Sequence, residues 1–95
     1  MDVNWAIKTA VNTGKVELGA KQTRVIAKKG DAKMIIRARN CPFPDFVGEK
    51  HGAVPVYTYP GTGQELGAAC GKAFAVAVCA VIDPGTSGIT SLLKQ

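Results

Sequence analysis

The sequence predicts an α/β protein, a three-layer α/β/α sandwich around a small four-stranded mixed sheet. Two observations support this prediction. Segments with helical periodicity alternate along the chain with short segments that have the pattern of strands, and glycines and prolines separate most of them. The 95 residues also suffice for one hydrophobic core but not for two, so we expect residues 1–95 to form a single domain.

The first half of the chain contains two predicted helices and two predicted strands. Apolar residues recur at helical spacing from Asp2 to Asn12, shortly before a glycine. Lys15–Leu18 alternates with a period of two, as a short strand does. Helical periodicity returns over Ala20–Lys29, and Met34–Ile36 has the composition of a strand buried on both faces. These segments form a strand-helix-strand unit with short connections.

The segment that follows is harder to interpret. Phe43–Gly52 contains proline and glycine, so any helix there must be short or irregular. Val54–Tyr59 alternates as a third strand, whose Pro55 is best placed at the strand's start or at a sheet edge.

The last part of the chain predicts a helix, a strand and a terminal turn. Thr62–Glu65 has the spacing of a capping box and opens a helix that ends at Gly71. Ala75–Ile82 is the most apolar run of the chain and should form a central, fully buried strand. Ile89–Leu93 suggests a terminal helical turn that covers one edge of the core. The order of the strands cannot be read from these patterns.

Composition argues against a membrane or secreted protein. The longest apolar stretch, Ala73–Ile82, has about ten residues, whereas a membrane-spanning helix needs roughly 20. The first residues lack the basic region and apolar run of a secretory signal, so we expect a cytoplasmic protein with reduced thiols. Three widely spaced cysteines, Cys41, Cys70 and Cys79, fit neither a disulfide framework nor a zinc site, and we interpret them as structural.

Catalytic patterns are weak. Gly61–Gly67 superficially matches a nucleotide-binding glycine motif, but it lacks the lysine and hydroxyl residue of a phosphate loop and follows the third predicted strand instead of the first. A turn with a helix cap accounts for the segment without any ligand. Ser87 and Ser91 lie outside any nucleophile elbow, and His51, the single histidine, sits in a turn-like segment as an exposed bystander. We therefore expect no enzyme activity, no cofactor and no metal.

Positive charge is concentrated where RNA could be bound. The net charge is +5, with a pI near 9.3, and seven cations fall in one stretch with a single acid: Lys21, Arg24, Lys28, Lys29, Lys33, Arg37 and Arg39. The helix that begins after Gly19 would direct free N–H groups and Lys21 outward, a favourable site for phosphate.

Other polar and aromatic residues could join this helix start. If the first two strands are parallel neighbours, Arg39 and Asn40 leave the second strand at the same end, where an amide can read unpaired base edges. Phe74 falls in a loop and could stack on an extruded base. Each feature also has a simpler interpretation, since a basic helix face is most often only solvated and Phe74 could cap the core.

Several motifs resemble one known family. They are Gly14–Thr23, Asp31–Ile36, Ala38–Asn40, Glu65–Gly67, Cys70–Phe74 and Asp83–Gly85. Over nearly the whole chain the sequence is similar to the archaeal and eukaryotic large-subunit ribosomal proteins of the "L thirty e" family, and it looks more archaeal than eukaryotic. Related proteins of small ribonucleoproteins usually show Gly-x-Asn-Glu at the helix start, where this chain has Lys21-Gln22 after Gly19-Ala20, which favours the ribosomal branch.

The resemblance implies a three-layer α/β/α sandwich that recognises a kink-turn, an RNA internal loop with a sharp bend and an extruded base. Carried over by position, the contacts come from Gly19–Arg24, Ala38–Pro42 and Lys72–Ala75. The RNA-binding residues implied are Gly19, Ala20, Lys21, Gln22, Thr23, Arg24, Arg39, Asn40, Lys72 and Phe74. The chain departs from the family at Val25, often basic in relatives, at Ala75, where an arginine can occur, and in the shortened segment Pro42–Gly52.

The resemblance also assigns roles and partners. Lys21 and Arg24 would bind phosphates, Gln22 and Asn40 would contact bases, and Phe74 would stack. The expected partners are ribosomal RNA and neighbouring proteins of the large subunit, with the protein a monomer off the ribosome and located in the cytoplasm. The alternative within RNA binding is a subunit of a guide ribonucleoprotein or of RNase P.

Overall fold

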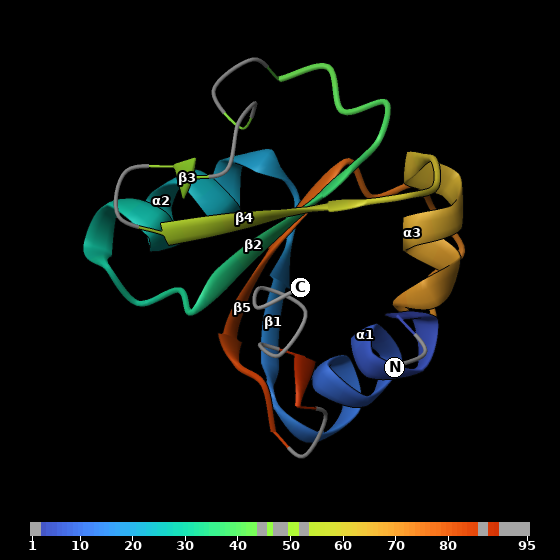
Figure 1. Ribbon diagram of the computed structural model, residues 1–95, viewed down its shortest axis with the longest axis horizontal. Helices are drawn as coiled ribbons and strands as arrows, with labels where there is room; N and C mark the ends of the chain where they lie inside the picture. Colours follow the sequence, from blue (N-terminus) through green and yellow to red (C-terminus); the bar gives the residue numbers. More distant parts are fainter. Residues whose placement is uncertain (1–2, 44–45, 47–49, 52–53, 86–87, 90–95) are drawn as a thin grey trace.

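The computed structural model describes residues 3–43, 46, 50–51, 54–85 and 88–89. In these residues a mixed sheet lies between helices on its two faces (Figure 1). The predicted three-layer α/β/α sandwich is thereby confirmed. The terminal turn predicted over Ile89–Leu93 lies outside the described residues except for Ile89, which is fully buried.

The described strands include the four predicted from the sequence and one more. They are β1 (Lys15–Leu18), β2 (Met34–Ala38), β3 (Lys50–His51), β4 (Val54–Tyr59) and β5 (Val78–Asp83). The additional strand, β3, has two residues and pairs with the first two residues of β4, including Pro55. Proline has no N–H group to donate, but at a strand start this affects the hydrogen bonds to only one neighbouring strand, so proline is tolerated there. The side chain of His51 lies outside the described part, so its predicted exposure stays a prediction.

The strand order is β1-β5-β2-β4-β3. β5 pairs antiparallel with both β1 and β2, and β2 pairs parallel with β4. The two strands of the first strand-helix-strand unit are thus parallel in direction, but they are not neighbours, because β5 lies between them. The prediction that the most apolar strand is central and buried is confirmed, since β5 is paired along both edges and Val78–Val81 are buried.

The start of β5 was predicted too early. The apolar run begins at Ala75, but pairing begins at Val78, and Val76 is buried although it lies in a loop. Its N–H donates to the carbonyl of Gly63 (2.9 Å), and so Val76 is held outside the ladder. Apolar composition indicates burial, and here burial extends beyond the strand.

Three helices are described, α1 (Val3–Thr13), α2 (Ala20–Lys29) and α3 (Gly63–Ala69). The bounds of α2 match the prediction, and α1 ends one residue later than predicted. The capping box predicted for α3 is present, with the Thr62 hydroxyl accepting from Glu65 N–H and the Glu65 carboxylate accepting from Thr62 N–H. None of the helices in the described ranges combines the length and apolar character needed to cross a membrane.

Two core clusters lie on opposite faces of the sheet. α1 and α3 cover one face and α2 covers the other (Figure 1). The first cluster contains Ala6, Ile7 and Ala10 of α1, Leu66 of α3, and Met34, Ile36, Ala38, Tyr59, Cys79 and Val81 of the sheet. The second contains Ile35, Phe46, Val54, Val56 and Val78, with Ala20 and Ala27 of α2 packed against it. Alternate residues of β2 and β5 therefore supply both cores, which explains their nearly unbroken apolar sequences.

The three cysteines are free thiols. Cys70, at the end of α3, and Cys79, in β5, are both buried and share a hydrogen bond. That bond lowers the pKa of Cys70, whereas the same bond and burial raise the pKa of Cys79 well above its usual value. Cys79 therefore stays protonated and packs as a small core residue.

Candidate nucleic-acid interface

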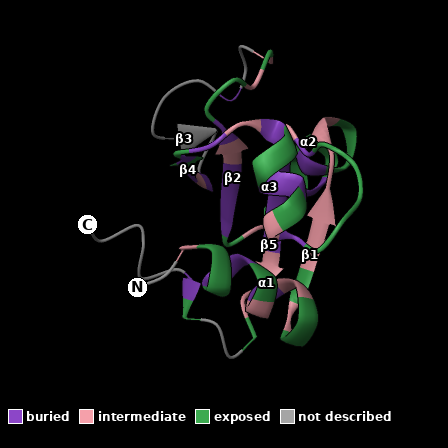
Figure 2. Cartoon of the chain, turned by 90° about the vertical axis from the view of Figure 1, so that its right-hand side faces the viewer, coloured by how far each residue is buried: buried purple, intermediate pink, exposed green. Residues whose placement is uncertain are grey.

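Three loops meet where β1 and β2 end and β5 begins, at the top of the molecule in Figure 2. The N–H of Gly19 donates to the carbonyl of Val78 (2.9 Å), and the N–H of Ala38 donates to the carbonyl of Ala77 (2.8 Å). The start of β5 is thus bonded to the segments that leave both neighbouring strands. We call this region the loop end, defined by residues 19–24, 38–42 and 72–75.

Gly19 makes the turn from β1 into α2. Its φ of +99° is a conformation that residues with a side chain rarely adopt. The carbonyl of Gly19 accepts from both the N–H (3.0 Å) and the hydroxyl (2.7 Å) of Thr23. Thr23 is fully buried, and the hydrogen bond from its hydroxyl to Gly19 stabilises the turn from the inside.

The start of α2 presents polar groups outward. Gly19 occupies the N-cap position without a side-chain cap, and no acid lies in the first turn. The first N–H groups of a helix have no partner within the helix, and they carry its positive dipole end. Lys21, Gln22 and Arg24 are exposed beside them. Together these groups form an electropositive surface at the loop end.

Arg39 and Asn40 leave β2 next to the start of α3. The N–H of Arg39 donates to the carbonyl of Gly61 (2.9 Å), and Asn40 Oδ1 accepts from the N–H of Gly63 (2.9 Å). The Asn40 side chain, predicted from the sequence to contact a base, therefore caps α3 with its oxygen. Its NH₂ group is the part of the amide that can still serve a ligand. These bonds and the capping box confirm that the glycine-rich Gly61–Gly67 segment is a turn and a helix cap.

Two substitutions of Asn40 can distinguish the capping role of its side-chain oxygen from the role of its NH₂ group. Asn40→Ala removes the acceptor for Gly63 N–H, and we expect the free energy of unfolding to fall by about 1 kcal/mol. Asn40→Asp keeps an acceptor and adds a negative charge at the helix N-terminus, which is favourable. We therefore expect Asn40→Asp to unfold within about 0.5 kcal/mol of the wild type in urea titrations. An equal loss in both variants would contradict the capping role.

The loop from α3 to β5 completes the loop end. Gly71 turns it with φ +78°, and the N–H of Lys72 donates to the carbonyl of Gly67 (2.9 Å). A Cβ atom added to Gly67 would lie only 2.0 Å from the carbonyl oxygen of Phe74, so the loop backbone lies directly against α3. Glycine at position 67 allows this close approach.

Phe74 is the most exposed large apolar side chain of the described residues, at 58%. It borders a shallow hollow of about 290 Å³, which it lines together with Gln64, Ala68, Lys72, Ala73 and Ala75. An aromatic ring held in solvent on a backbone that packs against a helix offers a face for stacking. The structure thus places Phe74 as the sequence predicted, outside the core.

One contact of the loop end could not be found from the sequence. The guanidinium carbon of Arg24 lies 5.0 Å from the centroid of the Phe43 ring and 5.6 Å from that of the Phe46 ring. Both distances fall in the range of cation–π interactions. Phe43 and Phe46 lie in a segment for which neither periodicity nor a motif gave a signal.

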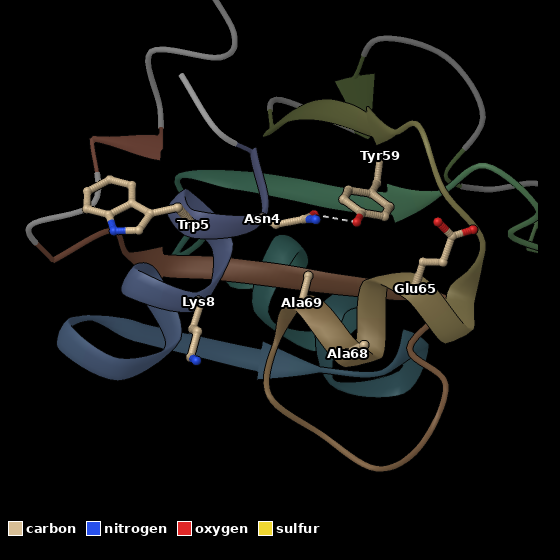
Figure 3. Close-up of a pocket in the computed structure, with 7 residues that line it drawn as sticks. All are labelled: Asn4, Trp5, Lys8, Tyr59, Glu65, Ala68 and Ala69. Carbon is tan, nitrogen blue, oxygen red and sulfur yellow. Dashed lines mark hydrogen bonds between the residues drawn. The ribbon is translucent and has the colours of Figure 1, made fainter.

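A second hollow, of about 420 Å³, lies between α1 and α3 (Figure 3). It is lined by Asn4, Trp5, Lys8, Tyr59, Glu65, Ala68 and Ala69. The hydroxyl of Tyr59, a buried residue of the first core cluster, donates to Asn4 Oδ1. Trp5 is 54% exposed at this hollow. Among the described residues no three histidine, cysteine or acidic side chains gather as they do around a metal ion.

The fold and the loop end together define a small α/β protein with a basic end that carries an exposed aromatic side chain. The chain belongs to the ribosomal protein L7Ae/L30e/S12e/Gadd45 family, whose model matches residues 1–91. The family resemblance deduced from the sequence is therefore confirmed.

Similar proteins from three archaea share one name, large ribosomal subunit protein eL30. The chain is 44% identical over 97 residues to that of Methanothrix thermoacetophila, covering 100% of this chain and 92% of the relative. It is 46% identical over 99 residues to that of Methanocaldococcus jannaschii, covering 100% and 90%. It is 44% identical over 96 residues to that of Methanospirillum hungatei, covering 99% and 100%.

Proposed function

We propose that this protein is a structural component of the large ribosomal subunit and binds ribosomal RNA at a kink-turn through its loop end. One observation carries the proposal. Backbone hydrogen bonds hold the uncapped start of α2, the segment of Asn40 and the loop of Phe74 together at one end of the sheet. The shared name of the similar archaeal proteins supports the ribosomal assignment.

Each group of the loop end has a proposed role. Lys21 and Arg24 bind phosphates, assisted by the free N–H groups that follow Gly19. Gln22 and the NH₂ group of Asn40 contact bases, and Phe74 stacks on an extruded base. Arg39 and Lys72 add positive charge at the rim, and Thr23 contributes indirectly by stabilising the Gly19 turn.

The same proposal covers location and partners. The protein works in the cytoplasm on the ribosome, beside neighbouring proteins of the large subunit, and is a monomer when free. It catalyses no reaction, and its contribution is to hold a bent RNA conformation. The protein prefers the bent RNA conformation because its stacking and base contacts need an exposed, unpaired base.

A gel shift tests the kink-turn assignment. The wild-type protein is titrated against an RNA with a kink-turn and against a straight RNA duplex of equal length and charge. We expect the kinked RNA to shift at lower protein concentration, and the preference to persist as salt is raised, because phosphate contacts weaken with salt for both RNAs. Equal affinity for the two RNAs would leave only nonspecific electrostatics and overturn the proposal.

Sedimentation separates the ribosomal role from that of a guide ribonucleoprotein or RNase P subunit. In gradients of cell extract we expect the protein to migrate with large ribosomal subunits. Migration with small ribonucleoproteins alone would favour the alternative.

A further inference from the structure

Arg24 stands apart from the other cations of the loop end because it stacks on aromatic rings. It begins the second turn of α2 and lies over Phe43 and Phe46, at 5.0 and 5.6 Å from the two ring centroids. Its side chain is exposed, as a residue that meets a ligand must be. The rings follow residues 38–42 of the loop end in the sequence, so this contact joins α2 to the segment that continues from the second part of the loop end.

The two rings are held in place by the second core cluster. Phe46 is fully buried in the second core cluster, beside Ile35 and Val56. Phe43 is half-buried against the same cluster, and its carbonyl accepts from the N–H of Phe46 (3.3 Å). The rings are therefore positioned by the core, and Arg24 is positioned by the rings.

Stacking is compatible with phosphate binding. A guanidinium group uses its face to lie on an aromatic ring, whereas its N–H groups point outward in its own plane, where they match two phosphate oxygens. An arginine held in this way loses less conformational freedom when it binds than a flexible lysine does. Preorganisation of this kind improves affinity without a new contact to the ligand.

We propose that Phe43 and Phe46 are positioning residues of the RNA interface, which hold the Arg24 guanidinium in place for an RNA phosphate before the RNA binds. The inference rests on the proposed function. It extends the interface to two residues that do not contact the RNA themselves. It also explains the use of arginine at position 24, since lysine has neither the planar group nor the paired donors.

A double-mutant cycle tests the coupling. Kd for the kink-turn RNA is measured for the wild type, Phe43→Leu, Arg24→Ala and the double variant, at a temperature where circular dichroism shows each to be folded. We expect Phe43→Leu to raise Kd about two- to fivefold, the range of an exposed cation–π contact. In the Arg24→Ala background it should have no further effect, and Phe43→Tyr should keep wild-type affinity.

Lys21 supplies the matched control, because it is a cation of the same helix start, three residues before Arg24. In a Lys21→Ala background, Phe43→Leu should still raise Kd by the same factor as in the wild type. A purely structural role of Phe43 would instead weaken binding equally in all backgrounds, including Arg24→Ala. That result would overturn the inference and leave the proposed function intact. If the wild type does not prefer the kinked RNA, both are overturned.

Discussion

Replacing Phe74 by alanine is expected to weaken binding of a kink-turn RNA by about 1–3 kcal/mol, or roughly 5- to 150-fold in Kd. Phe74 is 58% exposed, so its removal leaves no cavity in the core. The loss should arise from the stacking face alone, and the unfolding temperature should change little. Titration of labelled RNA measures the effect directly. Phe74→Tyr keeps an aromatic face and should retain most of the affinity.

Trp5 is the matched control for this substitution. It is an aromatic side chain of similar exposure, 54%, but it lies at the hollow between α1 and α3 and not at the loop end. Trp5→Ala should leave Kd for the kink-turn RNA unchanged. If Phe74→Ala had no effect, or if both substitutions weakened binding equally, Phe74 would have to be removed from the interface.

Replacing Gly67 by alanine is expected to lower the free energy of unfolding by about 2–3 kcal/mol. The new Cβ would lie 2.0 Å from the Phe74 carbonyl oxygen and 3.0 Å from its carbonyl carbon. Both atoms belong to the backbone, so either α3 or the loop must move. Alanine favours helix by about 1 kcal/mol over glycine, which offsets only part of this strain. Thermal unfolding should show a decrease of roughly 10 °C or more.

The same substitution should reduce RNA affinity, because the displaced backbone carries Phe74. Gly63→Ala is the control in the same helix. Its Cβ would meet Val76 at 3.4 Å, an ordinary contact, and its backbone bonds to Asn40 and Val76 remain possible. We expect Gly63→Ala to be nearly neutral for both stability and binding. A Gly67→Ala variant as stable as the wild type would show that the loop does not need its close approach to α3.

The secondary structure could largely be predicted because its signals are local. The helical periodicity of α2 gave its bounds, and the spacing of Thr62 and Glu65 gave the start of α3. Two errors have physical causes. β3 has two residues, too few for any alternation to be visible, and the apolar residues before Val78 are part of the core without being part of the strand.

The exposed groups of the candidate interface could be predicted, but the hydrogen bonds and ring contacts that arrange them could not. Lys21 and Phe74 are exposed as expected. The Asn40 oxygen, however, is used by Gly63, which lies 23 residues away in the sequence, and Arg24 stacks on rings of a segment beyond β2. Contacts over such separations depend on the packing of the whole chain, and no local pattern contains them.

The sequence by itself determined an α/β protein, the positions of its helices and longer strands, and a basic helix start after Gly19. Only the tertiary structure decided that β5 lies between β1 and β2, and hence that its preceding loop brings Phe74 to the loop end. The physical reason is that apolar runs indicate which strands are buried, whereas strand order depends on backbone hydrogen bonds between distant segments. Several orders would bury the same side chains, so the apolar pattern alone does not select one of them.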